Sequence, residues 1–453
     1  MDRPSAAERA PRIEVRGQCT SERQVRSMTT TRRTMLGLLG ASAASGAALA
    51  AAAAPASAAT AGAAGATARH GARGGADGGI PEELRPGGEF DRFVREQAEA
   101  GEFSGSVLLT YHGRPVLARS YGMADQARGI ENGPGTRFAL ASVTKLFTAV
   151  AIAQLAEAGE IDYARTVGTY LDGFPEEVAG KVTVHHLLTH TSGLGDLFQI
   201  PGFEQTAAGW TTLQQAMDGA TDLIRGTGTD FTPGAGWQYS NSGYHVLGAI
   251  VQEVSGRSYF DYIREHVFRA AGMTDSDFFT AEQWRTDPSL AHPYALQPSG
   301  EREDVVDRKN FVGSPSGDAF ATSGDMARFA DALLGERLAG PAFTEITLGG
   351  KLPNVGSMQG PGQPAPAAAS NGAAPAAAGP ARAMFQCYGP MRVLLNGQWG
   401  IGHSGGSQGE STDVQMYPAG GWVSVVLSNI DYPQGTFPPV VEKARVLITG
   451  TGE

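Results

Sequence analysis

The sequence predicts an α+β protein: an antiparallel sheet built from both ends of the chain and flanked by helices, with a mostly helical domain inserted between the two halves. Two observations favour this fold class. Strand-like patterns occur at 105–121 and again at 391–428. Between them, from about 160 to 345, apolar residues are mostly spaced as in helices and loops. Strands at both ends of a chain most simply join in one layer.

The first half of the expected sheet lies between two predicted helices. Helical spacing begins near Glu89. Residues 105–111 and 115–121 predict a β-hairpin, because His112-Gly113 supplies a turn between two strand-like runs. The second helix is expected over 142–158, where apolar residues recur at helical spacing and a glycine follows as a stop.

The inserted region and the second half of the sheet come next. Thr183 is a candidate cap of a short helix that ends at Leu188, and longer helices are expected at 241–254 and 324–334. In the closing part of the chain, four strands are expected at 391–395, 400–403, 412–417 and 422–428. A helix is expected after them, at 440–448.

Composition divides the chain further. A stretch of Pro, Ala, Gly and Ser predicts a flexible surface insertion, and an earlier stretch of Ala and Gly with few charges predicts disorder. The predicted organisation is an export signal with an upstream extension at 1–58, a disordered linker at 59–85, a sheet domain at 86–160 and 384–453, a helical domain at 161–350 and the insertion at 355–382.

The export signal is predicted from three features. Arg32 and Arg33 precede an apolar run from 35 to 54, and Pro55-Ala56-Ser57-Ala58 matches the small-residue pattern of a cleavage site. The arginine pair resembles the twin-arginine type. An uncleaved anchor helix is the alternative, but the run is rich in Ala, which contributes little to membrane insertion. We expect a secreted or extracytoplasmic protein that meets the membrane only during export.

Composition also excludes several kinds of partner. The 453 residues carry a formal net charge of −11 without a basic stripe, so nucleic acid is not an expected ligand. The chain has two cysteines, Cys19 and Cys387, and Cys19 lies ahead of the predicted signal. The remaining thiol forms neither an intramolecular disulfide nor a thiolate metal cluster. We expect no cofactor and no metal ion.

The candidate catalytic pair is Ser142 and Lys145, at the start of the helix expected over 142–158. A spacing of three places both side chains on one helix face, and a helix N-terminus favours negative charge. A neutral amine beside a hydroxyl takes its proton and so activates a weak nucleophile, whereas arginine does not deprotonate. The Ser-x-x-Lys motif alone is weak evidence for a catalytic site. The alternative is a serine that caps the helix and a solvated lysine.

Two further motifs support an active site. Tyr239-Ser240-Asn241 stands at the start of the helix expected at 241–254. Taken alone, Asn241 is typical of a helix cap and Tyr239 of a buried aromatic residue. Gly402-His403-Ser404-Gly405-Gly406 ends a predicted strand, and its glycines allow close backbone approach and free N–H groups.

Together the motifs resemble those of the serine β-lactamase and penicillin-binding protein family, in its class C-like branch. That branch includes D-Ala-D-Ala carboxypeptidases, D-aminopeptidases and carboxylesterases. The resemblance implies a β-lactamase/transpeptidase-like fold and spans roughly residues 90–453 without the insertion. The segments 138–145, 186–194 and 402–406 are similar to family sequences, and the three ordered motifs are Ser142–Lys145, Tyr239–Asn241 and His403–Gly405.

The resemblance implies a role for each residue. Ser142 attacks an acyl carbonyl and forms an acyl-enzyme, while Lys145 and Tyr239 share the proton transfers. The backbone N–H groups of Ser142 and Gly406 form the oxyanion hole. The residues expected to bind substrate are Asn241, His403, Ser404 and Gly405.

Two other patterns in the chain are weaker. Gly-x-Ser-x-Gly occurs around Ser404 and Ser407, as in the nucleophile elbow of α/β-hydrolases. Those enzymes need a histidine further along, and His403 is the last in the chain. The second pattern is a cluster of three histidines, His185, His186 and His190, which could bind a metal ion. It lacks the carboxylate spacing of a zinc protease, so we interpret these histidines as packing and loop-bracing residues.

The sequence therefore predicts an exported serine hydrolase that acts on a small peptide, β-lactam or ester. The favoured activity is that of a D-Ala-D-Ala carboxypeptidase, because His403 stands where class C β-lactamases have lysine. The alternatives are a carboxylesterase or β-lactamase on the same fold, and a non-catalytic binding or regulatory protein. Gln408 and Glu410 stand where family members often have proline and an aromatic residue, so the substrate class stays open.

Overall fold

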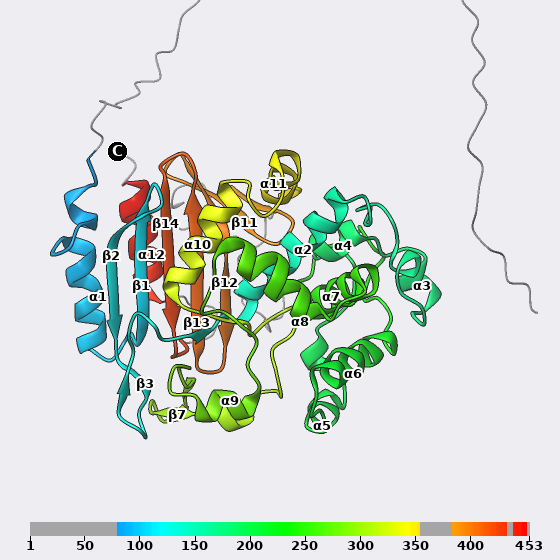
Figure 1. The fold of residues 1–453 in the computed structure, drawn as a ribbon, viewed down its shortest axis with the longest axis horizontal. Helices are drawn as coiled ribbons and strands as arrows, with labels where there is room; N and C mark the ends of the chain where they lie inside the picture. The colour runs from blue at the N-terminus through cyan, green and yellow to red at the C-terminus, as the bar shows by residue number, and fades with distance from the viewer. Residues whose placement is uncertain (1–78, 354–382, 433–437, 451–453) are drawn as a thin grey trace, which may run out of the picture. The chain divides into compact units, whose positions relative to one another are not determined.

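The computed structural model describes residues 79–353, 383–432 and 438–450. The expected export signal at 1–58 and the expected insertion at 355–382 lie outside these residues. Within them the predicted fold class is confirmed: a large antiparallel sheet has helices on both faces, and further helices lie beyond one of these faces (Figure 1). No helix in the described ranges is long and apolar enough to cross a bilayer.

The main sheet has eight strands and joins the two ends of the chain. The first and last strands in sequence order are neighbours in the sheet, with Gly105 opposite Ser428 and Tyr111 opposite Trp422. Every neighbouring pair is antiparallel. The order across the sheet is β2 (Arg114–Tyr121), β1 (Gly105–Tyr111), β14 (Trp422–Ser428), β13 (Glu410–Tyr417), β12 (Gln398–Ser407), β11 (Met391–Leu395), β10 (Met384–Gln386) and β9 (Leu352–Pro353).

Two terminal helices, α1 (Glu89–Glu99) and α12 (Pro439–Thr449), cover one face of this sheet (Figure 1). Phe90 of α1 and Val441 of α12 are buried in the same apolar cluster as Val426 of β14. Burying side chains of this size contributes roughly 1.5–3 kcal/mol each. The chain ends are therefore joined both through strand pairing and through a shared core.

The other face carries α2 (Lys145–Glu157) and α10 (Ser323–Leu334). Phe147 of α2 packs edge-to-face on Phe329 of α10, with 4.9 Å between the ring centroids. Nearly every residue of α2 is buried, including its first, Lys145. A helix that is apolar on all sides belongs in the interior of a protein, and this position keeps the lysine away from water.

The remaining helices lie mostly beyond α2, on the side away from the sheet (Figure 1). Thr183 caps a helix that ends at Leu188, as predicted. The helices beyond α2 are α3 (Glu176–Ala179), α4 (Val184–Leu188), α5 (Phe203–Ala207), α6 (Leu213–Arg225), α7 (Asn241–Ser255) and α8 (Tyr259–Tyr262) with a π-helical continuation (Ile263–Arg269). Two further helices lie elsewhere: α9 (Ala281–Thr286) near β7, and α11 (Pro341–Leu348), which packs on α2 (Figure 1).

Short elements complete the described chain. Three small antiparallel pairs lie outside the main sheet. They are β3 (Met123–Asp125) with β4 (Ile130–Glu131), β5 (Phe138–Ala139) with β8 (Phe320–Ala321), and β6 (Tyr294–Leu296) with β7 (Arg302–Asp304). The 3-10 turns are η1 (Glu82–Leu84), η2 (Ala141–Thr144), η3 (Val167–Thr169), η4 (Leu197–Gln199) and η6 (Val306–Arg308).

Two segments differ from the predicted organisation. The part of the expected linker 59–85 that the structure describes is ordered: η1 forms there, and Leu84 is fully buried in the core beneath α1. The expected helical domain 161–350 also ends too late, because α10 packs on β1 and β14 and belongs to the sheet layers. Tertiary contacts of single apolar side chains decided both boundaries, and composition does not reveal such contacts.

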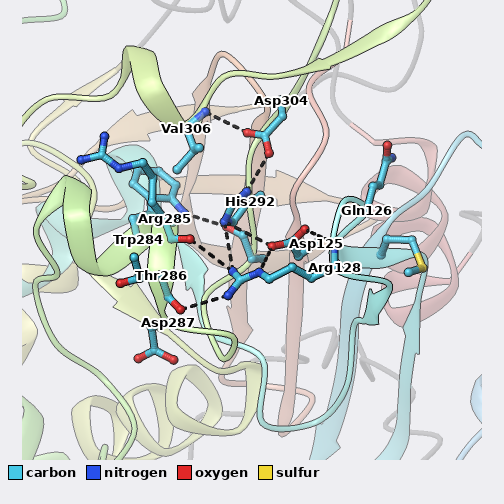
Figure 2. A network of polar contacts seen from close by, with 12 residues as sticks. Asp125, Gln126, Arg128, Trp284, Arg285, Thr286, Asp287, His292, Asp304 and Val306 are labelled. Atoms are coloured by element: carbon cyan, nitrogen blue, oxygen red, sulfur yellow. Dashed lines mark hydrogen bonds and ion pairs between the residues drawn. The ribbon is translucent and has the colours of Figure 1, made fainter.

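A buried polar network fixes the segment before β6 (Figure 2). His292 lies between two carboxylates, with Nδ1 2.7 Å from Asp304 and Nε2 3.6 Å from Asp125. Arg128 pairs with Asp125 from the other side. The next residue, Pro293, packs on Gly409, where an added Cβ would lie 2.5 Å from its carbonyl carbon. The network therefore supports the β12–β13 turn.

We predict that this network stabilises the fold in a pH-dependent way. Burial lowers the pKa of His292, but the hydrogen bond and charge of Asp304 and the charge of Asp125 outweigh it, so the pKa is raised. The histidine then contributes stability that is complete below its unfolded pKa of about 6.5 and is lost as pH rises through the folded pKa.

Thermal unfolding of the wild type and His292→Gln at pH 5.5 and pH 8.5 checks this expectation. The substitution should lower the Tm more at pH 5.5 than at pH 8.5. An equal loss at both values would contradict a stabilising charged histidine.

Candidate active site

Ser142 occupies a tight turn at the start of the central helix. It lies in η2, directly ahead of α2, and its predecessor Ala141 has a left-handed φ of 43°. Such a conformation is unusual for a residue with a side chain and clusters at functional sites. The carbonyl of Leu140 accepts a hydrogen bond from Thr412 Oγ1 at 2.8 Å. The nucleophile turn is therefore held by the sheet.

The amine of Lys145 is fully buried and has three polar neighbours. Nζ lies 2.7 Å from Asn241 Oδ1, 2.6 Å from the carbonyl oxygen of Ser316 and 3.1 Å from Ser142 Oγ. A neutral amine has two N–H groups and one lone pair. The amide and carbonyl oxygens accept its two hydrogens, which leaves the lone pair for the hydroxyl of Ser142.

The environment makes this neutral form of Lys145 accessible near neutral pH. Burial lowers its pKa to about 7, although the negative charges of Asp196 and Asp318 act in the opposite direction. Desolvation disfavours the charged form of an amine. A base whose pKa lies near neutrality is suited to proton transfer at physiological pH.

The nucleophile also accepts a hydrogen bond from Tyr239. The tyrosine hydroxyl lies 2.8 Å from Ser142 Oγ, and burial raises its pKa, so it carries its proton at neutral pH. The ring stacks on His190 with 4.5 Å between centroids. His190 Nδ1 accepts a hydrogen bond from the backbone N–H of Ser240 at 3.1 Å, which locks the segment behind the tyrosine.

Asn241 is oriented by a carboxylate that the sequence did not indicate. Its Nδ2 donates to Asp196 at 3.1 and 3.2 Å, so its Oδ1 faces Lys145. Asp196 also caps η4 through the backbone N–H of Phe198. The sequence around Asp196 indicates at most a helix cap. The contact between Asp196 and Asn241 arises only in the folded chain.

The third motif lies on β12, beside the nucleophile turn. Gly405 faces that turn so closely that an added Cβ would lie 2.4 Å from Leu140 O and 3.0 Å from the backbone nitrogen of Ser142. Gly406 and Ser142 line the same cavity. The structure thus brings the first and third motifs into contact, as the family resemblance implies.

His403 is buried and neutral on the same face of the sheet. Burial first, and then the charge of Lys145, lower the pKa of His403 to about 3. Its Nδ1 donates to the carbonyl oxygen of Ser404 at 2.6 Å, which leaves Nε2 as an acceptor. A neutral histidine offers a hydrogen bond but no positive charge to a substrate.

The Ser404 side chain points away from the site, so a substrate-binding role of this residue would fall to its backbone. Its hydroxyl donates to Asp413 at 2.6 Å, and Asp413 also pairs with Arg445 of α12. Successive side chains of a strand point to opposite faces. Since His403 faces the site, the neighbouring Ser404 side chain faces α12.

The other histidines of the predicted cluster brace the fold. His186 completes a capping box with Thr183 at the start of α4. His185 Nδ1 lies 2.8 Å from the hydroxyl of Tyr388. His190 alone touches the site, through Tyr239. The structure therefore agrees with a packing and loop-bracing role.

Lys309 and Glu410 form a buried ion pair at the mouth of the site. Lys309 Nζ also donates to Ser407 Oγ at 3.2 Å and to the carbonyl oxygen of Gln408 at 2.8 Å. Burial raises the pKa of Glu410, and the charge of Lys309 opposes this shift. One ammonium group therefore holds the turn that follows Gly406.

Comparison with known proteins agrees with this geometry. The profile of the Beta-lactamase family matches residues 90–444. The chain belongs to this family, whose fold and site define a class of serine hydrolases. The arrangement of a hydroxyl, a neutral amine and a phenol around one point is suited to acyl transfer.

Two curated relatives and one solved structure illustrate the similarity. Penicillin-binding protein 4* of Bacillus subtilis is 34% identical over 44% of this chain and 42% of its own length. Penicillin-binding protein 4 of Amycolatopsis lactamdurans is 27% identical over 72% of this chain and 80% of its own. A penicillin-binding protein of Bacillus halodurans has a TM-score of 0.63 and 26% identity, covering 78% and 98% of the two chains.

The first curated matches are partial. The aligned segments cover 56%, 42% and 38% of the lengths of three penicillin-binding or related proteins, so the chain spans about half of the length of these relatives or less.

We predict that acylation of the protein depends on pH through Lys145. Only the unprotonated amine accepts the serine proton, so the rate should rise with pH and level off above about 7. Below that value each pH unit should lower the rate about tenfold. Stopped-flow acylation by a chromogenic penicillin between pH 5 and 9 measures the profile.

Asp196→Asn gives a matched variant. It keeps an acceptor for Asn241 but removes a charge that raises the pKa of Lys145. Its profile should shift towards lower pH. A shift towards higher pH, or a rate independent of pH from 5 to 8, would contradict the assignment of Lys145.

We also predict that Gly405→Ala slows acylation by roughly 100-fold. The new methyl group must push β12 away from the nucleophile turn, and displacements of about 1 Å have effects of this size. Gly133→Ala is the control, because nothing lies within 4 Å of its added Cβ. Equal acylation rates in the two variants would show that the close approach of Gly405 is unimportant.

Proposed function

We propose that the protein is an exported serine hydrolase that forms an acyl-enzyme on Ser142 and releases D-Ala from peptides ending in D-Ala-D-Ala. The single observation that carries the enzymatic part is the geometry of Lys145. Its two hydrogens are taken by Asn241 and Ser316, and its third neighbour is Ser142 Oγ at 3.1 Å.

Acylation proceeds in two steps. Ser142 Oγ attacks the substrate carbonyl carbon as its proton passes to Lys145 Nζ, and the new oxyanion lies between the backbone N–H groups of Ser142 and Gly406. The C–N bond then breaks, and the leaving amine takes the proton of Tyr239, which Lys145 replaces. Each oxyanion donor of this kind contributes about 10²–10³ in rate.

Deacylation uses the same groups in reverse. A water molecule attacks the acyl carbonyl carbon while its proton passes to the neutral amine of Lys145 through the protonated hydroxyl of Tyr239. The ester bond to Ser142 breaks, and Ser142 Oγ recovers a proton from the same pair. The products are a free carboxylic acid and the original enzyme.

Three observations support the peptide substrate and the location. Relatives of the chain are named penicillin-binding proteins. His403 offers a neutral hydrogen-bonding group where class C β-lactamases have lysine. The arginine pair, apolar run and small-residue site near the start of the sequence support export through a twin-arginine signal.

We predict that a fluorescent penicillin labels the wild type on Ser142 and does not label Ser142→Ala. Peptide mapping of the adduct by mass spectrometry identifies the modified residue. Ser404→Ala is the matched control: it should keep most of the labelling, because its hydroxyl bonds to Asp413 on the far face. Removing that bond should lower stability by about 1 kcal/mol. Labelling of Ser142→Ala would contradict the assignment of the nucleophile.

The substrate is tested by incubating the full chain with a peptide ending in D-Ala-D-Ala and measuring free D-Ala. Release by the wild type but not by Ser142→Ala is the expected result. Rapid hydrolysis of short esters without release of D-Ala would overturn the peptidase and favour a carboxylesterase. An absence of acylation by every probe would favour a non-catalytic protein.

A further inference from the structure

The cavity at Ser142 has one wall of aromatic side chains. Phe198 packs edge-to-face on Phe203, with 5.3 Å between centroids, and Phe203 packs in the same way on Trp210 at 5.8 Å. All three line the cavity that also contains Ser142 and Gly406. They come from η4, α5 and the turn before α6, and we call them the aromatic wall.

The aromatic wall ends in an exposed side chain. Phe198 is 44% exposed, and it is one of the few large apolar residues in the described chain that are so accessible. Phe203, which packs on Phe198, is only 5% exposed. It therefore fixes the position of the Phe198 ring. An exposed aromatic ring beside a nucleophile offers apolar surface that a bound group can cover.

The position of Tyr239 indicates whether the leaving group or the acyl group of the substrate enters this cavity. The leaving group must lie near Tyr239, because that hydroxyl supplies its proton. Ser142 lines the cavity, whereas Tyr239 and His403 lie outside its walls. The acyl group, which stays bonded to Ser142, therefore extends away from Tyr239 and into the cavity.

The opposite wall of the cavity is held in place. Lys309, Ser407 and Gln408 line it, and Lys309 ties the other two together through Ser407 Oγ and the carbonyl oxygen of Gln408. Its ammonium is also paired with Glu410 and is almost buried. The contacts of Lys309 therefore fix this part of the lining, and the aromatic wall supplies the apolar surface that a bound acyl group can cover.

We propose that the acyl subsite favours acyl groups with a large apolar group beyond the carbonyl carbon, and that Phe198 is the residue that recognises this group. In a peptide ending in D-Ala-D-Ala the group belongs to the residue before the two alanines, because the acyl alanine itself carries only a methyl group. The inference rests on the proposed acyl-enzyme mechanism and concerns its substrate. A phenyl ring in the acyl group offers apolar surface that can cover Phe198, whereas an acetyl group offers only a methyl group.

The test compares two esters with the same leaving group, p-nitrophenyl acetate and p-nitrophenyl phenylacetate. The wild type should hydrolyse the phenylacetate with a kcat/KM at least tenfold higher, after correction for spontaneous hydrolysis. Phe198→Ala should lower kcat/KM for the phenylacetate about tenfold and change the acetate less than twofold, within the range of apolar pockets. Phe198→Leu keeps an apolar side chain and should restore part of the preference.

Ile346→Ala is the control, because Ile346 is 37% exposed on α11 and lies outside the cavity. It should leave both rates unchanged. Equal hydrolysis of the two esters by wild type and Phe198→Ala, with normal penicillin labelling of Ser142, would overturn the subsite alone. Equal losses for both esters in Phe198→Ala would also overturn it, because the side chain would then act only on structure. A wild type that neither hydrolyses esters nor reacts with penicillin would refute the proposed function and the subsite together.

Discussion

The structure of the site depends on keeping one amine out of water. Lys145 is fully buried, and burial lowers its pKa to about 7. A buried polar group is costly unless its hydrogen bonds are satisfied, so both N–H groups need partners. Those partners come from α7 and from the loop at Ser316, while the third neighbour, Ser142, belongs to the turn before α2. Three distant parts of the chain must therefore meet at one nitrogen atom.

The sheet brings the other side of the site to this point. Pairing of β1 with β14 joins the two ends of the chain, and the succession β14, β13, β12 then carries the third motif across to the nucleophile turn. Thr412 of β13 bonds to Leu140, and Gly405 of β12 has no side chain to separate the two elements. The oxyanion site proposed for Ser142 and Gly406 is thus a property of the whole sheet.

The turn after β12 is held from two directions. Lys309 and Glu410 fasten it on the side of the cavity, and the segment fixed by His292 packs on Gly409. Both contacts use charges that are at least partly buried, and such charges require good partners. Gln408 and Glu410, which depart from common family residues, therefore belong to a support of the cavity wall in this chain. This support and the aromatic wall together shape the space available to an acyl group.

The sequence by itself determined the two groups of strands at 105–121 and 391–428, several of the helices between and around them, and three candidate motifs, because periodicity and motif spacing are local properties. It also placed Ser142 and Lys145 on one helix face, since three residues separate them. It did not reveal Asp196, the carbonyl of Ser316, the role of Lys309 or the direction of the Ser404 side chain. Only the tertiary structure decided these points, because burial, strand facing and the meeting of distant loops depend on packing between segments that are far apart in the chain.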